Sequence, residues 1–176
     1  DFLWHSVVGF EVNIEALLSP PHFMLAAAGV LIITGPLRSL VLNAKLGHKT
    51  RHQGWRALFP LIISLLNVLS LLTFFTQYSN VFSQGQLLTN RPGDDVFMWE
   101  VAALSFVTIP TFLTMSIVLF AVRRWRLPFG ALTVLLGLNA LLMWLVHFGE
   151  MQRYGPILIG PFLAGLVGDL LLHQRG

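Results

Sequence analysis

Five long apolar runs constrain this chain more than any other feature of its sequence. A helix needs about 20 mostly apolar residues to cross the hydrocarbon core of a bilayer. The runs cover residues 23–42, 57–78, 96–122, 129–148 and 156–172. We therefore expect an all-α integral membrane protein, with about five transmembrane helices in one domain that covers residues 1–176. Residues 1–22 would form a helix end and a connection at one surface of the bundle.

The composition supports a membrane protein and excludes several other classes. Hydrophobic residues make up 55% of the chain, charged residues make up 11%, and the mean hydropathy is +0.73. A soluble domain carries about 25% charged residues. The basic pI is therefore no sign of nucleic-acid binding, and the expected surroundings are a lipid bilayer. Because the chain has no cysteine, it has no disulfide, no thiolate metal site and no iron–sulfur cluster.

The cations are distributed unequally between the two ends of the predicted spans. Two of them, Arg91 and Arg153, lie on the side of the amino terminus. The other nine are Arg38, Lys45, Lys49, Arg51, Arg56, Arg123, Arg124, Arg126 and Arg175. Loops rich in lysine and arginine face the cytoplasm. We expect an inner (cytoplasmic) membrane of a bacterium or archaeon, with residues 1–22 on the outer, periplasmic face.

Three residues near the amino terminus form a candidate metal site. Asp1 and His5 are four apart, so they share one face of a helix. His22 follows Pro20 and Pro21 and opens the first apolar run. The two prolines end the preceding element and present His22 at a helix start. A carboxylate with two imidazoles is a ligand set for copper, zinc or iron. Without metal, Asp1 and His5 would be a hydrogen-bonded helix-end pair, and His22 an interfacial histidine.

Four further residues could supplement this site. Glu15 and Glu11 are four apart, and either could add a ligand or hold a ligand histidine through its second ring nitrogen. The alternative is an amphipathic interfacial helix over this segment. His147 and Glu150 lie three apart at the outer end of the fourth run, where they could add a ligand or a proton relay. The alternative there is an interfacial histidine with a solvated carboxylate.

A second acid–imidazole pair lies at the opposite end of the last span. Asp169 and His173 repeat the four-residue spacing, but on the cytoplasmic side. We interpret them as a hydrogen-bonded pair at a helix end, where the histidine complements the helix C-terminus.

The first segment resembles a known family. Residues 1–5 read D-F-L-W-H and residues 19–22 read S-P-P-H. The two elements resemble the copper-site segment in the C subunit of the copper membrane monooxygenases, the particulate methane and ammonia monooxygenases. The resemblance covers residues 1–25. The connection between His5 and His22 is longer than in the family and lacks its Arg–Asp pair. The family's second metal site, with an Asn and two His, has no match here.

The resemblance implies a function and partners. Copper would bind Asp1, His5 and His22, although the ligand types alone leave zinc open. An oxygen-dependent subunit would oxidise a small substrate such as ammonia, methane or a short hydrocarbon, within a hetero-oligomer of membrane subunits. The alternatives are a non-enzymatic copper-handling or structural subunit of a membrane complex, and a metal-free scaffold. Because Asp1 is the first residue, we also expect further sequence upstream to complete its helix.

Overall fold

The computed structural model describes residues 6, 7, 9, 19–46, 54–80, 96–146 and 152–174. Every regular element in these ranges is a helix, which confirms the predicted all-helical fold for the described part of the chain. The elements are α2 (Pro20–Ile33), α3 (Gly35–Lys45), α4 (Trp55–Phe75), η2 (Gln77–Ser79), α5 (Val96–Arg124), α6 (Ala131–Val146), η4 (Gln152–Leu158) and α7 (Ile159–Gln174).

Three helical segments are long and apolar enough to cross a bilayer. They are Trp55–Phe75, Glu100–Arg124 and Gly155–Gln174. The α2–α3 pair adds a fourth if the two bent helices are counted as one span. Helix α6 is apolar but has only 16 residues, fewer than the usual length of about 20. The described residues thus give three or four spans, and the predicted count of about five stays a prediction.

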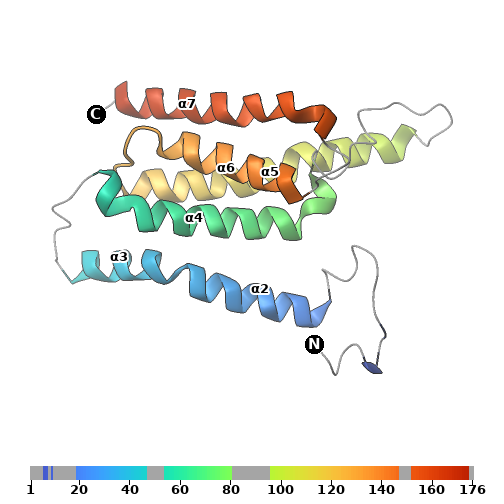
Figure 1. Cartoon of the computed structure of the whole chain (residues 1–176), viewed down its shortest axis with the longest axis horizontal. Helices are drawn as coiled ribbons and strands as arrows, with labels where there is room; N and C mark the ends of the chain where they lie inside the picture. The colour runs from blue at the N-terminus through green and yellow to red at the C-terminus, as the bar shows by residue number, and fades with distance from the viewer. Residues whose placement is uncertain are drawn as a thin grey trace.

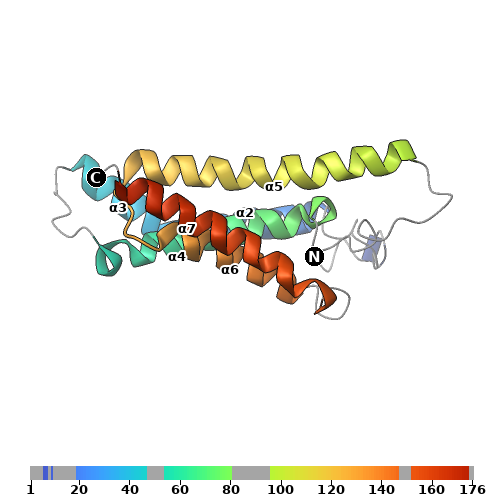
Figure 2. The same cartoon turned by 90° about the horizontal axis from the view of Figure 1, so that it is seen from above.

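The helices run up and down along one common axis. Figure 1 shows that α2, α5 and α7 begin at the same end of the bundle, where α4 and α6 stop. We call this the His22 end. At the opposite end α3 and α7 stop, and α4 and α6 begin; we call this the Asp169 end. Figure 2 shows α5 along one side of the bundle and α7 running obliquely across it.

Most of the described cations gather at one end of this axis, whereas Arg38 lies at the break between α2 and α3 and Arg153 lies in η4. Arg56 begins α4, Lys45 ends α3, and Arg123, Arg124 and Arg126 lie at or just beyond the end of α5. All five therefore belong to the Asp169 end. Their placement agrees with the charge asymmetry that the sequence predicts for the two faces of the bundle.

The first predicted span is broken between α2 and α3, which meet at an angle of 43°. Pro36 lacks a backbone N–H and therefore removes one helical hydrogen bond at the break. Side chains supply donors instead: the Arg38 guanidinium donates to the carbonyl of Leu31, and the Ser64 hydroxyl of α4 donates to the carbonyl of Ile33. A bent helix is tolerated at membrane depth when its freed carbonyls find such donors.

Helix α4 is the central element of the core. Its buried side chains pack against α5 and α6, and partly buried side chains of α3 cover it from a third direction. The buried core residues are Leu58, Leu61, Ile62, Leu65, Leu66, Leu69, Ala121, Ala131 and Leu135. Helices α5 and α7, by contrast, bury little of their apolar surface within the described structure. Large apolar side chains that face outward on them fit contact with lipid rather than water.

Small residues allow α6 and α7 to approach closely. A Cβ atom added at Gly165 would lie 2.5 Å from the Cα atom of Thr133, and one added at Gly168 would lie 2.9 Å from a methyl carbon of Leu132. Real Cβ atoms essentially never approach other heavy atoms to less than 3.0 Å. In membranes, glycine allows this kind of backbone-to-backbone packing.

Asp169 joins the same two helices. The residue is 2% exposed, and its carboxylate accepts hydrogen bonds from the backbone N–H of Leu132 (3.0 Å), the backbone N–H of Thr133 (2.9 Å) and the Thr133 hydroxyl (2.7 Å). The predicted Asp169–His173 pair is therefore wrong. The His173 ring instead lies edge-on to Phe129, with 5.9 Å between ring centroids. The unpaired N–H groups at the start of α6 are the partners of the carboxylate.

Candidate metal centre

His22 lies in the first turn of α2, at the His22 end of the bundle. Ser19 is the residue before the helix, and Pro20 and Pro21 are its first two residues. Since neither proline has an N–H group, the first turn has little need of a side-chain cap. The Ser19 hydroxyl makes no capping hydrogen bond, and its Oγ atom lies 2.8 Å from Nδ1 of His22. The Pro-Pro sequence thus leaves the serine available to the imidazole.

This hydrogen bond fixes the orientation of a ring whose second nitrogen is open. Ser19 is only 4% exposed, whereas His22 is half-buried. Among the described residues, Nε2 of His22 has no hydrogen-bond partner. In the tautomer with hydrogen on Nδ1, the Nδ1–H group donates a hydrogen bond to the Ser19 hydroxyl oxygen, and Nε2 presents its lone pair. Metal-bound histidines are usually held in this way, through a hydrogen bond at the nitrogen that does not bind the metal.

The remaining predicted site residues lie outside the described residues. These are Asp1, His5, Glu11, Glu15, His147 and Glu150. The convergence of Asp1, His5 and His22 therefore stays a prediction. Within the described ranges, no group of three or more His, Asp or Glu side chains could hold one metal ion. His22 is the one predicted ligand whose surroundings the structure describes, and those surroundings suit a ligand.

The structure also reveals a polar cluster that the sequence analysis did not predict. Asn139 on α6 accepts hydrogen bonds at its amide oxygen from the hydroxyls of Ser70 (3.1 Å) and Thr73 (3.0 Å) on α4. Thr73 is fully buried. The only sequence signal was the presence of an amide inside an apolar run, because its two partners lie more than 60 positions away in the chain. Buried hydrogen bonds of this kind hold membrane helices together.

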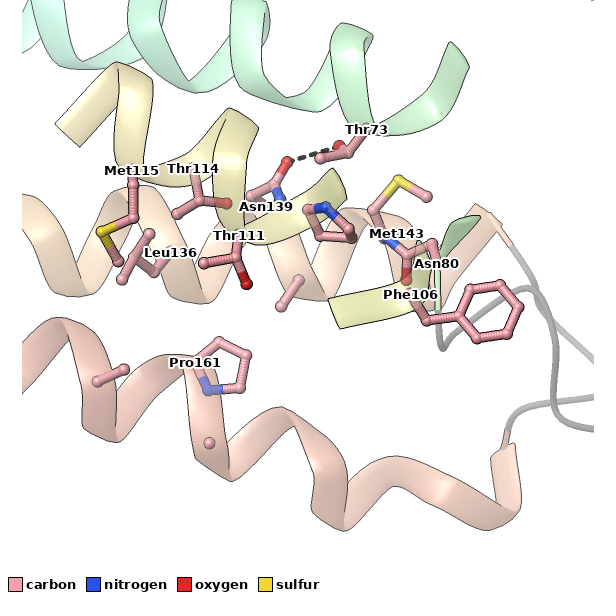
Figure 3. Close-up of a pocket in the computed structure, with 14 residues that line it drawn as sticks. Thr73, Asn80, Phe106, Thr111, Thr114, Met115, Leu136, Asn139, Met143 and Pro161 are labelled. Atoms are coloured by element: carbon pink, nitrogen blue, oxygen red, sulfur yellow. Dashed lines mark hydrogen bonds between the residues drawn. The ribbon is translucent and has the colours of Figure 1, made fainter. Parts of the chain in front are cut away.

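A cavity of about 340 Å³ opens beside this cluster. Figure 3 shows Thr111, Thr114 and Met115 of α5 on one side of it, Asn139 of α6 facing them, and Pro161 of α7 opposite. The full lining is Thr73, Asn80, Phe106, Pro110, Thr111, Thr114, Met115, Leu136, Asn139, Ala140, Met143, Gly160, Pro161 and Ala164. The lining extends from the His22 end, at Asn80 and Gly160, to the middle of the bundle, at Thr114 and Leu136. The cavity volume is in the range of small-molecule sites, about 300–1,000 Å³.

No protein-family model, no curated protein and no solved structure matches this chain.

Proposed function

We propose that this chain is a metal-binding subunit of an integral membrane complex, and that the metal is copper. The observation that supports the proposal is the half-buried His22 ring: its Nδ1 atom is hydrogen-bonded to Ser19, and its Nε2 atom has no partner among the residues that the structure describes. The metal ligands in this proposal are His22, Asp1 and His5. We also propose that the His22 end faces the outside of the membrane, because lysine and arginine gather at the Asp169 end.

His22 is well placed to take part in such a site. The side chain sits at the start of an apolar helix, so a ligand there can be partly screened from water without deep burial in lipid. Ser19 restricts the rotation of the ring, which lowers the ordering cost of binding an ion. The carboxylate and the second imidazole would come from the segment that carries Asp1 and His5, and Glu15 is the first candidate for an additional or supporting group. Imidazole and carboxylate ligands accept both copper and zinc.

The proposal also includes an enzymatic activity. When bound with an open coordination position, copper could activate oxygen for the oxidation of ammonia, methane or a short hydrocarbon. The proposed activity is supported by the sequence resemblance over residues 1–25. A non-enzymatic role in copper handling, or in the structure of a larger complex, uses the same ligands. Both forms of the proposal therefore depend on metal binding at His22.

Metal content of the purified chain tests the proposal. The protein is prepared with a tag that contains no histidine, loaded with Cu²⁺ in lipid nanodiscs, dialysed and analysed for copper per chain. We expect one tightly held copper in the wild type and its loss in His22→Ala. His173→Ala is the matched control, because it removes an imidazole at the opposite end of the bundle. Ser19→Ala should weaken copper binding by about 10–100-fold, the usual effect of removing the partner of a ligand histidine.

Equal copper content in the wild type and His22→Ala would contradict the proposal. The same holds if His173→Ala removes as much copper as His22→Ala, since the metal would then bind imidazoles without regard to their place. The oxygenase form of the proposal is tested with the copper-loaded chain assembled with its partner subunits. If this complex consumes no oxygen with ammonia, methane or a short hydrocarbon, the non-enzymatic role is the one that remains.

A further inference from the structure

The cavity between α4, α5, α6 and α7 has apolar walls and no charge. Phe106, Met115, Leu136 and Met143 supply much of its apolar wall. In the described part of the chain, none of the lining side chains carries a formal charge. A charged molecule would lose its hydration there without compensation. An aromatic or flat ring is favoured, because methionine sulfur makes favourable contacts with ring edges.

Two hydroxyls on the wall of this cavity are not used within their own helix. Thr76 and Ser116 each donate to a carbonyl four residues earlier in their own helix. Thr111 and Thr114, like Thr108 outside the cavity, have no hydrogen-bond partner among the described residues. Thr111 is exposed and Thr114 is half-buried. Because Thr111 and Thr114 line the cavity, both hydroxyls are available to a molecule bound there.

Asn139 provides a third donor from the opposite wall. Its amide oxygen is occupied by the hydroxyls of Ser70 and Thr73. Its amide nitrogen has no partner within the described ranges. Figure 3 shows Asn139, Thr111 and Thr114 around the same space. One amide N–H₂ and two hydroxyls can all donate to oxygen atoms of a ligand.

We propose that this cavity binds a small, uncharged, lipid-soluble ring compound that carries carbonyl groups. Its carbonyl oxygens accept hydrogen bonds from Thr111, Thr114 and Asn139, and its ring packs against the apolar wall. The compound enters from the lipid phase. This site is distinct from the metal site and does not depend on the presence of copper.

Two probe molecules of similar shape test the proposal. The first is 2-methyl-1,4-naphthoquinone, which has two carbonyl groups, and the second is 2-methylnaphthalene, which has none. Binding to the full chain in phosphatidylcholine nanodiscs is measured by equilibrium dialysis, and partition into empty nanodiscs is subtracted. The absence of cysteine prevents thiol adducts with the quinone. We expect one saturable quinone site, with an affinity at least about tenfold higher than that of the hydrocarbon, the ratio expected when each of two carbonyl groups gains a hydrogen bond that contributes about threefold.

The hydroxyl variants test which groups recognise the carbonyls. The double substitution Thr111→Val and Thr114→Val keeps the shape of both side chains and removes their donors. It should reduce the preference for the quinone to about threefold or less, the contribution left to Asn139. Thr108→Val is the matched control: the same substitution on α5, at an exposed position that does not line the cavity. It should leave the preference unchanged.

A second pair of variants tests the location. Ala164→Phe places a ring in the cavity and should abolish saturable binding of the quinone. Val167→Phe adds the same ring at an exposed position of α7 outside the cavity and should have no effect. The proposal is overturned if the quinone shows no saturable binding, if both probes bind equally, or if binding survives Ala164→Phe. Equal binding of the two probes would indicate that the cavity holds only lipid chains.

Discussion

Replacement of Asp169 by alanine tests what holds α6 against α7. The residue is 2% exposed, and its carboxylate accepts three hydrogen bonds, two from backbone N–H groups and one from a hydroxyl. Leu132 and Thr133 are the second and third residues of α6, so their N–H groups have no partner within that helix. The positive end of the helix dipole favours a negative charge at the same place. Asp169 therefore caps α6 from a different helix.

The size of the effect follows from the groups that lose their acceptor. A hydrogen bond to a charged group contributes about 1.5–3 kcal/mol. In Asp169→Ala two buried N–H groups lose their acceptor, while the Thr133 hydroxyl can turn to a helix carbonyl. Allowing for some relaxation and entry of water, we expect a loss of about 3–5 kcal/mol in the free energy of unfolding. Asp169→Asn keeps one amide oxygen as an acceptor and should cost about 1–3 kcal/mol.

The measurement is reversible unfolding in mixed micelles, with SDS as denaturant and helix content followed by circular dichroism. Glu100→Ala is the matched control, because Glu100 is an exposed carboxylate at the opposite end of the bundle. It should change the free energy of unfolding by about 0.5 kcal/mol or less. If Asp169→Ala is no more destabilising than Glu100→Ala, the carboxylate does not hold α6 against α7.

Three other expectations concern packing and orientation. Gly165→Ala should cost about 1–3 kcal/mol in the same assay, because the added methyl meets the backbone of α6, whereas Gly160→Ala should be nearly neutral because no atom lies within 4 Å of the added carbon; similar losses for both would contradict the close packing. Ser64→Ala should cost about 1–3 kcal/mol, since the carbonyl at the end of α2 loses its donor; no change would show that this hydrogen bond is dispensable. Because the chain has no cysteine, single cysteines at Tyr78 and Lys45 can be labelled with a membrane-impermeant maleimide in sealed right-side-out vesicles, and we expect labelling from outside at Tyr78 alone; labelling of both would reject the orientation.

The helices of the bundle were largely predictable from sequence, because long apolar runs leave the chain few alternatives in a membrane. The predicted run 57–78 corresponds to α4 at Trp55–Phe75, and the run 96–122 corresponds to α5 at Val96–Arg124. The run 23–42 contains Gly35 and Pro36, so a break there was foreseeable, but its angle depends on donors from a neighbouring helix. The predicted run 129–148 begins too early, because α6 starts only after the turn at Gly130.

The site was less predictable, because hydrogen-bond partners distant in the chain leave no local pattern. The spacing of Asp169 and His173 suggested a pair within one helix, yet the start of α6 offers two buried N–H groups that bind a carboxylate more strongly than one histidine does. His22 was predicted at a helix start from Pro20 and Pro21, and the structure confirms that position. The role of Ser19 was missed, because a serine before a helix normally caps the backbone.

Pulsed EPR of the copper-loaded chain tests most directly whether His22 is a metal ligand. An imidazole bound to Cu²⁺ through one nitrogen gives a characteristic modulation from its remote nitrogen, here Nδ1 of His22 beside Ser19. With one Cu²⁺ per chain in nanodiscs, we expect the modulation of two equatorial imidazoles in the wild type and in His173→Ala. His22→Ala should lose the copper and therefore this modulation. A spectrum that is the same in the wild type and His22→Ala, or one without imidazole modulation, would contradict a copper site at His22.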